Sequence, residues 1–240
     1  MWAVTVCAVV VGIVWLHWRQ SDQKLADFLG LGCVHGYARL WHGCSIRGPS
    51  PRSIKGAAIL IANHTCSADP SFLQANCARW LSFLIAREFY GLLPLIDRVF
   101  EHQCSVPVAR DGRDVAAVRT ALRRLQEGRI VCVFPEGGLS GTGRGRLRPG
   151  KGGAALLALR SRAPVYPAFI AGGPQHHYVP RAWLLPSRVR VYFGPPVDLS
   201  AYYDRPINRP LLEEVTALLM RRIDSLRPQK RNQQSRRCLP

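Results

Sequence analysis

The chain has 240 residues, of which 48% are hydrophobic, so it can bury the core of one α/β domain. Lysine and arginine outnumber aspartate and glutamate by 33 to 15, and the charge of +18 favours a partner that is anionic over a large area, either nucleic acid or a membrane surface. The eight cysteines include no C-x-x-C pair and no matching histidine cluster, which argues against a zinc site and against a disulfide framework. We therefore expect mostly buried, reduced thiols in a protein that faces the cytosol.

Residues 2–18 form an uncharged, valine-rich segment with tryptophans near both of its ends. The segment is short, since about 20 residues are needed to cross a bilayer, but tryptophan suits the two interfaces of a membrane. It lacks a basic leader and a small-residue cleavage site, so we expect residues 1–20 to be retained as a membrane anchor. Basic residues that follow favour a cytoplasmic location for the rest of the chain, and a buried core helix is the alternative.

The remaining chain divides by composition into three parts. Residues 21–53 are expected to form a connection, with an apolar helix over 25–41 and a loop rich in Gly, Pro and Ser over 43–56. A single main domain is predicted over 54–227. The polar, basic tail at 228–240 is predicted to be disordered.

Strand and helix patterns alternate along the main domain. An apolar run predicts its first strand at 57–62, and the patterns that follow predict a helix from about Pro70, a strand at 81–86, a helix at 88–95 and a strand at 106–109. The second half predicts a helix at 111–126, a strand at 129–134, a helix at 152–160, strands at 164–170 and 189–193, and a helix at 211–226. This alternation predicts an α/β fold with a mostly parallel sheet flanked by helices.

The turn after the first strand carries a histidine and a carboxylate. His64 and Asp69 are five residues apart, so they would diverge on a continuous helix and can meet only if His64 lies in the turn before it. A carboxylate beside an imidazole fixes its tautomer and stabilises its protonated form, which makes the pair a candidate general base. Pro70 suits the first position of a helix, so Asp69 can equally be a helix cap, and both interpretations are open at this point.

Glycines and basic residues gather after the strand at 129–134. Glu136, Gly137 and Gly138 come first, and a loop dense in Gly and Arg continues to Lys151. Ligands commonly bind at the carboxyl ends of strands in open α/β sheets, and glycine backbones can form anion-binding concavities. The Gly-x-Gly-x-Gly run at 141–145 has neither the helix nor the later acidic residue of a dinucleotide site, so we expect no nicotinamide cofactor.

Four windows together resemble the glycerolipid acyltransferase family, membrane-associated enzymes that include 1-acylglycerol-3-phosphate acyltransferase. The first motif of the family, N-H-x-x-x-x-D, is similar to residues 63–69, and its third, F-P-E-G, is similar to residues 134–137. A strand that ends in arginine at 106–110 and an apolar P-V-x-P stretch at 164–167 resemble the second and fourth motifs. The similarity covers roughly residues 55–195. Many members continue the third motif with threonine and arginine, whereas this chain has glycine and leucine.

The resemblance implies acyl transfer from a thioester to a hydroxyl, a reaction that needs a base to take the proton of the alcohol. It implies a catalytic pair, His64 with Asp69 as its orienting partner. It also implies a substrate-binding set: Arg110, Glu136, Gly137, Lys151 and Pro164. Arg110 would clamp a phosphate through its planar guanidinium, and Glu136 would either bind acceptor hydroxyls or lock its own loop.

The expected acceptor is a lysophospholipid, 1-acylglycerol 3-phosphate above all, and the expected donor is acyl-CoA or an acyl-carrier protein, with no metal or other cofactor. Glycerol 3-phosphate and an amino-acid-derived lyso-lipid are alternative acceptors. A non-catalytic basic protein of the membrane surface is the alternative from another class. Nucleic acid is disfavoured because the arginines are scattered and are not interleaved with stacking aromatics. The sequence leaves the oligomeric state open.

Overall fold

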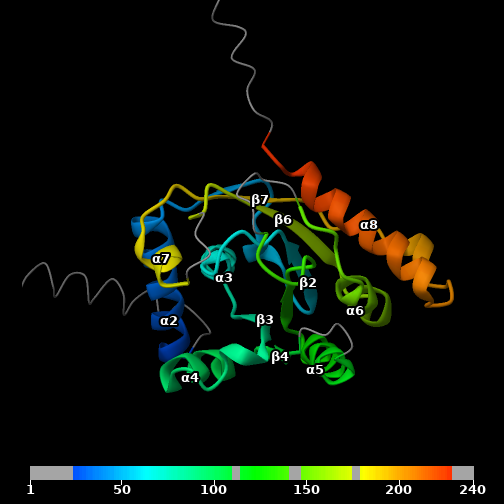
Figure 1. Cartoon of the computed structure of the whole chain (residues 1–240), viewed down its shortest axis with the longest axis horizontal. Helices are drawn as coiled ribbons and strands as arrows, with labels where there is room; N and C mark the ends of the chain where they lie inside the picture. The colour runs from blue at the N-terminus through cyan, green and yellow to red at the C-terminus, as the bar shows by residue number, and fades with distance from the viewer. Residues whose placement is uncertain (1–23, 110–113, 141–146, 175–178, 229–240) are drawn as a thin grey trace, which may run out of the picture.

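A seven-stranded sheet forms the centre of the computed structural model, which describes residues 24–109, 114–140, 147–174 and 179–228 (Figure 1). The strand order is β1-β7-β6-β2-β5-β3-β4, and every neighbouring pair is parallel except β6 and β7. The strands are β1 (Ser45–Arg47), β2 (Ala58–Ala62), β3 (Leu81–Ala86), β4 (Val106–Val108), β5 (Ile130–Val133), β6 (Val165–Ala171) and β7 (Arg190–Phe193). The predicted α/β fold with a mostly parallel sheet is confirmed.

Helices cover both faces of the sheet. On one face lie α2 (Leu25–Gly36), α3 (Asp69–Gln74) and α7 (Val179–Leu184), and on the other lie α5 (Val115–Gln126), α6 (Gly153–Ser161) and α8 (Arg209–Ser225). The central strand β2 is buried on both sides, because its alternate residues enter the two cores. Leu60 packs with the α3 side and Ile59 with the α8 side. The remaining helix, α4 (Pro94–His102), adjoins α2 through His102 and Asp27.

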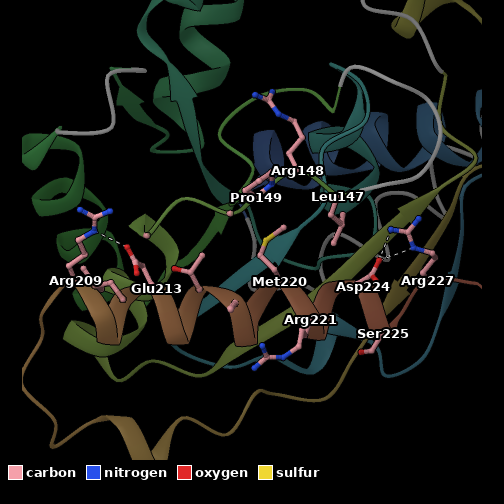
Figure 2. Close-up of a pocket in the computed structure, with 15 residues that line it drawn as sticks. Leu147, Arg148, Pro149, Arg209, Glu213, Met220, Arg221, Asp224, Ser225 and Arg227 are labelled. Carbon is pink, nitrogen blue, oxygen red and sulfur yellow. Dashed lines mark hydrogen bonds and ion pairs between the residues drawn. The ribbon is translucent and has the colours of Figure 1, made fainter.

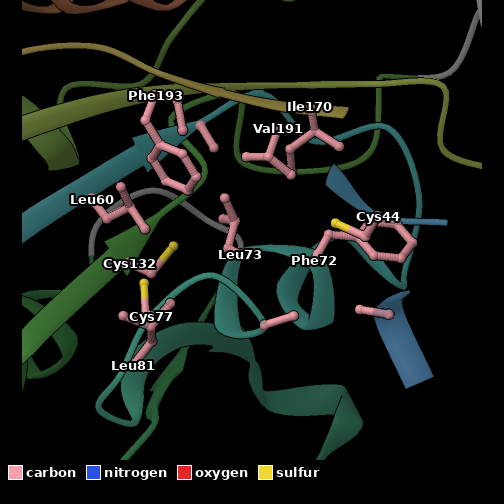
Figure 3. Packing of buried hydrophobic residues seen from close by; sticks show 14 of the residues in the cluster. Cys44, Leu60, Phe72, Leu73, Cys77, Leu81, Cys132, Ile170, Val191 and Phe193 are labelled. Atoms are coloured by element: carbon pink, nitrogen blue, oxygen red, sulfur yellow. The ribbon is translucent and has the colours of Figure 1, made fainter. Parts of the chain in front are cut away.

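Cysteine thiols fill part of the core on the α3 side (Figure 3). Cys77 and Cys132 are fully buried there beside Leu60 and Leu81, and none of the cysteines in the described ranges forms a disulfide. Burial raises the pKa of Cys77 to about 12, so this thiol stays protonated and packs as a small apolar side chain. The expectation of mostly buried cysteines is confirmed for the described residues.

Two local predictions are wrong, and one helix was not predicted. The helix expected at 88–95 is a 3-10 turn, Arg87–Phe89, and α4 begins only at Pro94, because Gly91 adopts a left-handed conformation with φ +81° that ends the turn. The loop expected at 43–56 contains β1, which pairs with β7 at the edge of the sheet. The pattern also did not predict α7. The helix expected at 25–41 is α-helical to Gly36 and continues as a π-helix, Tyr37–Trp41.

Within the ranges that the structure describes, no helix has both the length and the apolar character to cross a membrane. The anchor predicted at 1–20 lies outside these ranges, as does the tail predicted at 228–240 beyond its first residue. Both therefore stay predictions, together with the proposed domain limits.

Candidate active site

The chain leaves β2 in a fixed direction because Asn63 continues the pairing of the sheet through its side chain. Its Nδ2 donates to the carbonyl of Ile170 at 3.0 Å, and the Ile170 N–H donates to its Oδ1 at 2.6 Å. Asn63 is buried, so these bonds are shielded from water. The next residue, His64, is thereby placed at the carboxyl edge of the sheet beside β6.

Asp69 turns its carboxylate back toward His64 and does not cap the following helix. Its Oδ2 lies 3.0 Å from His64 Nδ1 and also accepts the backbone N–H groups of Thr65 and Cys66. The N-cap position belongs to Ala68, with no side-chain cap, so the helix-cap interpretation of Asp69 is wrong. The sequence predicted that the two residues could meet only if His64 lay in the turn before the helix, and His64 does lie in the turn before α3. The carboxylate is fully buried and has a complete set of donors.

The His64 imidazole is held in one tautomer and one plane. Because an ionised carboxylate only accepts hydrogen bonds, the proton between the two groups lies on Nδ1, which leaves the lone pair on Nε2. No residue in the described ranges forms a hydrogen bond with Nε2, and the side chain is 18% exposed. The Phe134 ring stacks on the imidazole with centroids 4.0 Å apart and planes at 15°. The arrangement presents an unoccupied basic nitrogen at the surface of the site.

Glu136 links the turn that contains His64 to the loop that follows β5 through two hydrogen bonds. Its Oε1 accepts the backbone N–H of His64, and its Oε2 accepts the backbone N–H of Arg148, both at 2.8 Å. The side chain is 2% exposed, and this burial raises the pKa of Glu136, although the two backbone donors oppose the effect. Both oxygens are thus engaged within the protein. The geometry favours the loop-locking interpretation over direct contact with acceptor hydroxyls.

Ser140 binds the same turn from the carbonyl side. Its backbone N–H and its hydroxyl both donate to the His64 carbonyl, at 2.7 and 2.6 Å. The backbone of His64 is therefore fixed on both sides by one loop, through Glu136 and Ser140. Neither Ser140 nor the stacking of Phe134 is predictable from the sequence, because neither residue has a local pattern that reveals a partner about 70 residues earlier.

Gly137 and Lys151 lie together in this loop. Gly137 has φ +65°, and a Cβ atom there would come within 2.6 Å of Lys151 Cε, so only glycine lets the lysine side chain cross its backbone. The Arg148 guanidinium lies next to Gly138 and Leu139, the positions at which many members of the resembled family have threonine and arginine. Its Nη1 donates to the Leu139 carbonyl at 3.1 Å and would be 3.5 Å from a Cβ on Gly138. A cation is therefore present beside Gly138 although the motif itself supplies none.

A groove of about 1190 Å³ lies between residues 147–152 and α8 (Figure 2). Two ion pairs line this groove. Arg209, the first residue of α8, pairs with Glu213, and Arg227, which follows the helix, pairs with Asp224. Segment 147–152 thus contacts α8 on one side, and the Arg148 backbone N–H holds Glu136 on the other.

One member of the predicted substrate-binding set is not part of this constellation. Pro164 precedes β6, and its carbonyl accepts the N–H of Ile59 near the start of the parallel strand β2. It therefore lies at the amino edge of the sheet, whereas His64 follows β2 at the carboxyl edge, and we remove Pro164 from the site. Arg110 lies outside the described residues.

The Cys66 thiol lies within the turn but is not a candidate nucleophile. Its Sγ is 3.2 Å from Asp69 Oδ1, and burial together with this carboxylate raises the pKa of the thiol well above its ordinary value. It remains a thiol that donates to Asp69. No group of three or more metal-ligating side chains is present in the part of the chain that the structure describes.

Comparison with known proteins places this geometry in a family context. The family model described as Acyltransferase matches residues 43–171, which is more than half of the chain. The 1-acyl-sn-glycerol-3-phosphate acyltransferases of Limnanthes alba and Limnanthes douglasii are each 27% identical to it over 217 residues, covering 85% of this chain and 70% of theirs. The crystal structure of the 1-acyl-sn-glycerophosphate (LPA) acyltransferase PlsC from Thermotoga maritima matches with a TM-score of 0.65 at 19% identity, over 92% of this chain and 91% of that one. At that identity the structural likeness shows the shared fold alone.

Proposed function

Because the chain belongs to the Acyltransferase family, we propose that it moves a fatty acyl group from a thioester, acyl-CoA or an acyl-carrier protein, to the hydroxyl of a lysophospholipid, with 1-acylglycerol 3-phosphate as its acceptor. The observation that carries this proposal is the 3.0 Å contact of His64 Nδ1 with buried Asp69, which leaves Nε2 available as a base. The similarity to the two Limnanthes enzymes supports the acceptor.

The reaction follows from this geometry. His64 Nε2 takes the proton of the acceptor hydroxyl as its oxygen attacks the thioester carbonyl, and Asp69 stabilises the imidazolium that forms. The resulting tetrahedral intermediate collapses when the carbon–sulfur bond breaks. His64 returns the proton to the leaving sulfur, so the products are a free thiol and a new ester, and the histidine is neutral again.

The intermediate carries negative charge on the former carbonyl oxygen, which needs a preorganised donor. The Gly137 N–H is already donated to the Phe134 carbonyl at 3.0 Å, so it is not available. The Gly138 N–H forms no hydrogen bond within the described ranges and is our candidate for the oxyanion donor.

The acceptor phosphate requires cations close to this loop. We assign Arg110 as the main ligand of the phosphate, because a guanidinium can bind two phosphate oxygens at once. Arg148 supports it from beside Gly138, and Lys151 contributes from above Gly137. We further propose that residues 1–20 hold the enzyme on a membrane with the domain on the cytoplasmic side, and that neither a metal nor nucleic acid is required.

The test measures thiol release from acyl-CoA or acyl-carrier protein by the full chain, with the acylated lipids identified by mass spectrometry. The acceptors are 1-acylglycerol 3-phosphate, glycerol 3-phosphate and an amino-acid-derived lyso-lipid. We expect His64→Ala to abolish the activity and the exposed His102→Ala to retain it, with both variants still folded and membrane-associated. Near-normal turnover by folded His64→Ala would refute the mechanism, and acylation of another acceptor only would replace the assigned substrate.

A further inference from the structure

Arginines gather on the exposed face of the C-terminal half of α8. Residues 217–227 contain one acidic residue, Asp224, and three arginines: Arg221, Arg222 and Arg227. Arg221 and Arg222 are exposed, and neither forms an ion pair with a residue in the described ranges. Arg227 donates to Asp224 through Nε and Nη2, which leaves its Nη1 for another partner. This end of the helix therefore carries an excess of positive charge that the reaction at His64 does not use.

This end of α8 is close to the edge of the sheet at which His64 lies. The Arg227 guanidinium lies over the Phe169 ring, with 5.2 Å between its Cζ and the ring centroid. The next residue of β6, Ile170, is bonded to Asn63, which directly precedes His64. The basic end of α8 is therefore separated from the catalytic turn by the last residues of one strand.

The groove described above runs along the same part of the helix (Figure 2). Met220 and Leu147 are partly buried apolar side chains that line it. A Cβ atom on Gly150 would come within 2.7 Å of Met220 Cγ, so glycine lets the methionine reach the opposite wall. Arg148 belongs to that wall, and its guanidinium donates to the Leu139 carbonyl beside the candidate oxyanion donor. The groove thus leads from the arginines of α8 to the loop of the active site.

The directions of the arginines favour an extended acidic surface over a single phosphate. In Figure 2, Arg148 points away from α8, Arg221 lies on the other side of the helix, and Arg227 lies at the helix end. A bound phosphate needs donors that converge on its oxygens, whereas the carboxylates of an acidic protein are spread over its surface. Arginine and methionine are also enriched in protein–protein interfaces. An acidic protein therefore fits this surface better than the nucleotide of acyl-CoA does.

We infer that the C-terminal half of α8 docks an acidic acyl-carrier protein, which brings its thioester to the active site. The docking surface, which we name the α8 surface, consists of Met220, Arg221, Arg222, Asp224 and Arg227. The inference rests on the proposed function, because a carrier protein is one of its two possible donors. The long, flexible pantetheine arm lets the carrier protein dock beside the sheet while its thioester passes the loop and reaches His64. The positive charge of the α8 surface, within a chain of net charge +18, steers an acidic partner toward it.

The test measures acyl transfer by the full chain, in detergent, from two donors that carry the same acyl chain, palmitoyl-acyl-carrier protein and palmitoyl-CoA. The double variant Arg221→Glu/Arg222→Glu is compared with Arg119→Glu/Arg160→Glu, which makes the same change of charge at exposed arginines of α5 and α6. The milder pair Arg221→Gln/Arg222→Gln covers the case in which reversed charges impair folding. Binding of holo-acyl-carrier protein to each variant is measured separately by fluorescence anisotropy.

We expect Arg221→Glu/Arg222→Glu to raise the KM for palmitoyl-acyl-carrier protein about tenfold or more and to leave the KM for palmitoyl-CoA within about twofold of its original value. The glutamine pair should show a smaller rise for the carrier protein only, and the control pair on α5 and α6 should change neither KM. In the unmodified chain, added salt should raise the KM for the carrier protein, because it screens exposed charges, and this dependence should be flatter in the glutamate pair.

Equal impairment with both donors would overturn the docking of a carrier protein, because the α8 surface would then serve the fold or the pantetheine arm that the donors share. Impairment with palmitoyl-CoA alone would assign the surface to the nucleotide and would overturn the docking as well. An unchanged KM for the carrier protein in the glutamate pair would have the same consequence. Binding of holo-acyl-carrier protein that depends on Arg221 and Arg222, without transfer from either donor, would remove the proposed function and leave the docking in place.

Discussion

Replacing Glu136 by glutamine separates a positioning role from a substrate contact. One oxygen of the glutamine amide can still accept a backbone N–H, but the amide NH₂ would face the second N–H, so one of the two 2.8 Å bonds from His64 and Arg148 is lost. A hydrogen bond to a charged group contributes about 1.5 to 3 kcal/mol, and removing the buried charge also removes part of its desolvation cost. We therefore expect the free energy of unfolding to fall by about 2 kcal/mol.

A loss of that size should lower the melting temperature of the unliganded chain by roughly 4 to 8 °C. Scanning fluorimetry in detergent measures the shift, and Glu213→Gln is the matched control because its exposed ion pair should contribute less than about 1 kcal/mol. Since His64 would lose one of its backbone anchors, kcat should fall more than the acceptor KM changes. An unchanged melting temperature with a raised acceptor KM would refute the positioning role and return Glu136 to the substrate.

Three other changes test the remaining contacts of the site and its surroundings. Asp69→Asn keeps the shape of the side chain but loses the charge that stabilises the imidazolium, so we expect kcat to fall by about 10² to 10⁴ in a thiol-release assay, and near-normal turnover would contradict the mechanism. Arg148→Ala retains the backbone bond to Glu136 and removes only the guanidinium, so kcat/KM should fall roughly 10- to 100-fold for a phosphate-bearing acceptor and much less for one without phosphate. Burial lowers the pKa of His42 from 6.5, so the stability that the neutral ring contributes is present above pH 6.5 and is lost as the pH falls through the lowered value. Melting curves between pH 7.5 and about pH 5 should show this loss in the unmodified chain and a flatter profile in His42→Gln, and parallel profiles would exclude His42 as the source.

The sequence predicted the buried strands well because apolar runs of that length leave few other structures. The strand at 81–86 has the predicted bounds, and the amphipathic helix at 111–126 appears as α5 from Val115. Elements whose formation depends on distant partners were missed. β1 is only three residues long and exists because β7 offers it hydrogen bonds, and α7 is fixed by Tyr37 and Trp41, which lie more than 140 residues earlier.

The residues of the site also divide into those that local sequence could predict and those that it could not. The types and order of residues in the first and third motifs identified His64, Asp69 and Glu136, but local sequence could not show whether Asp69 bonds forward to its helix or backward to His64. Three donors in the preceding turn decide in favour of the backward direction. The prediction that Pro164 belongs to the site was wrong for a related reason, because an apolar motif does not reveal at which edge of the sheet its first residue lies.

The register of the sheet explains why two motifs about 70 residues apart form one site. Ile61 of β2 pairs with Val133 of the parallel strand β5, and His64 and Glu136 each follow their strand residue by three positions. Parallel strands rise by equal steps, so the two residues leave the sheet at the same height and the backbone of His64 meets the carboxylate of Glu136. The spacing between strand and motif is therefore part of the active-site geometry. One residue inserted at the exit of either strand would leave every side chain present, yet it would move His64 about 3.3 Å from its backbone anchor, further than a hydrogen bond tolerates.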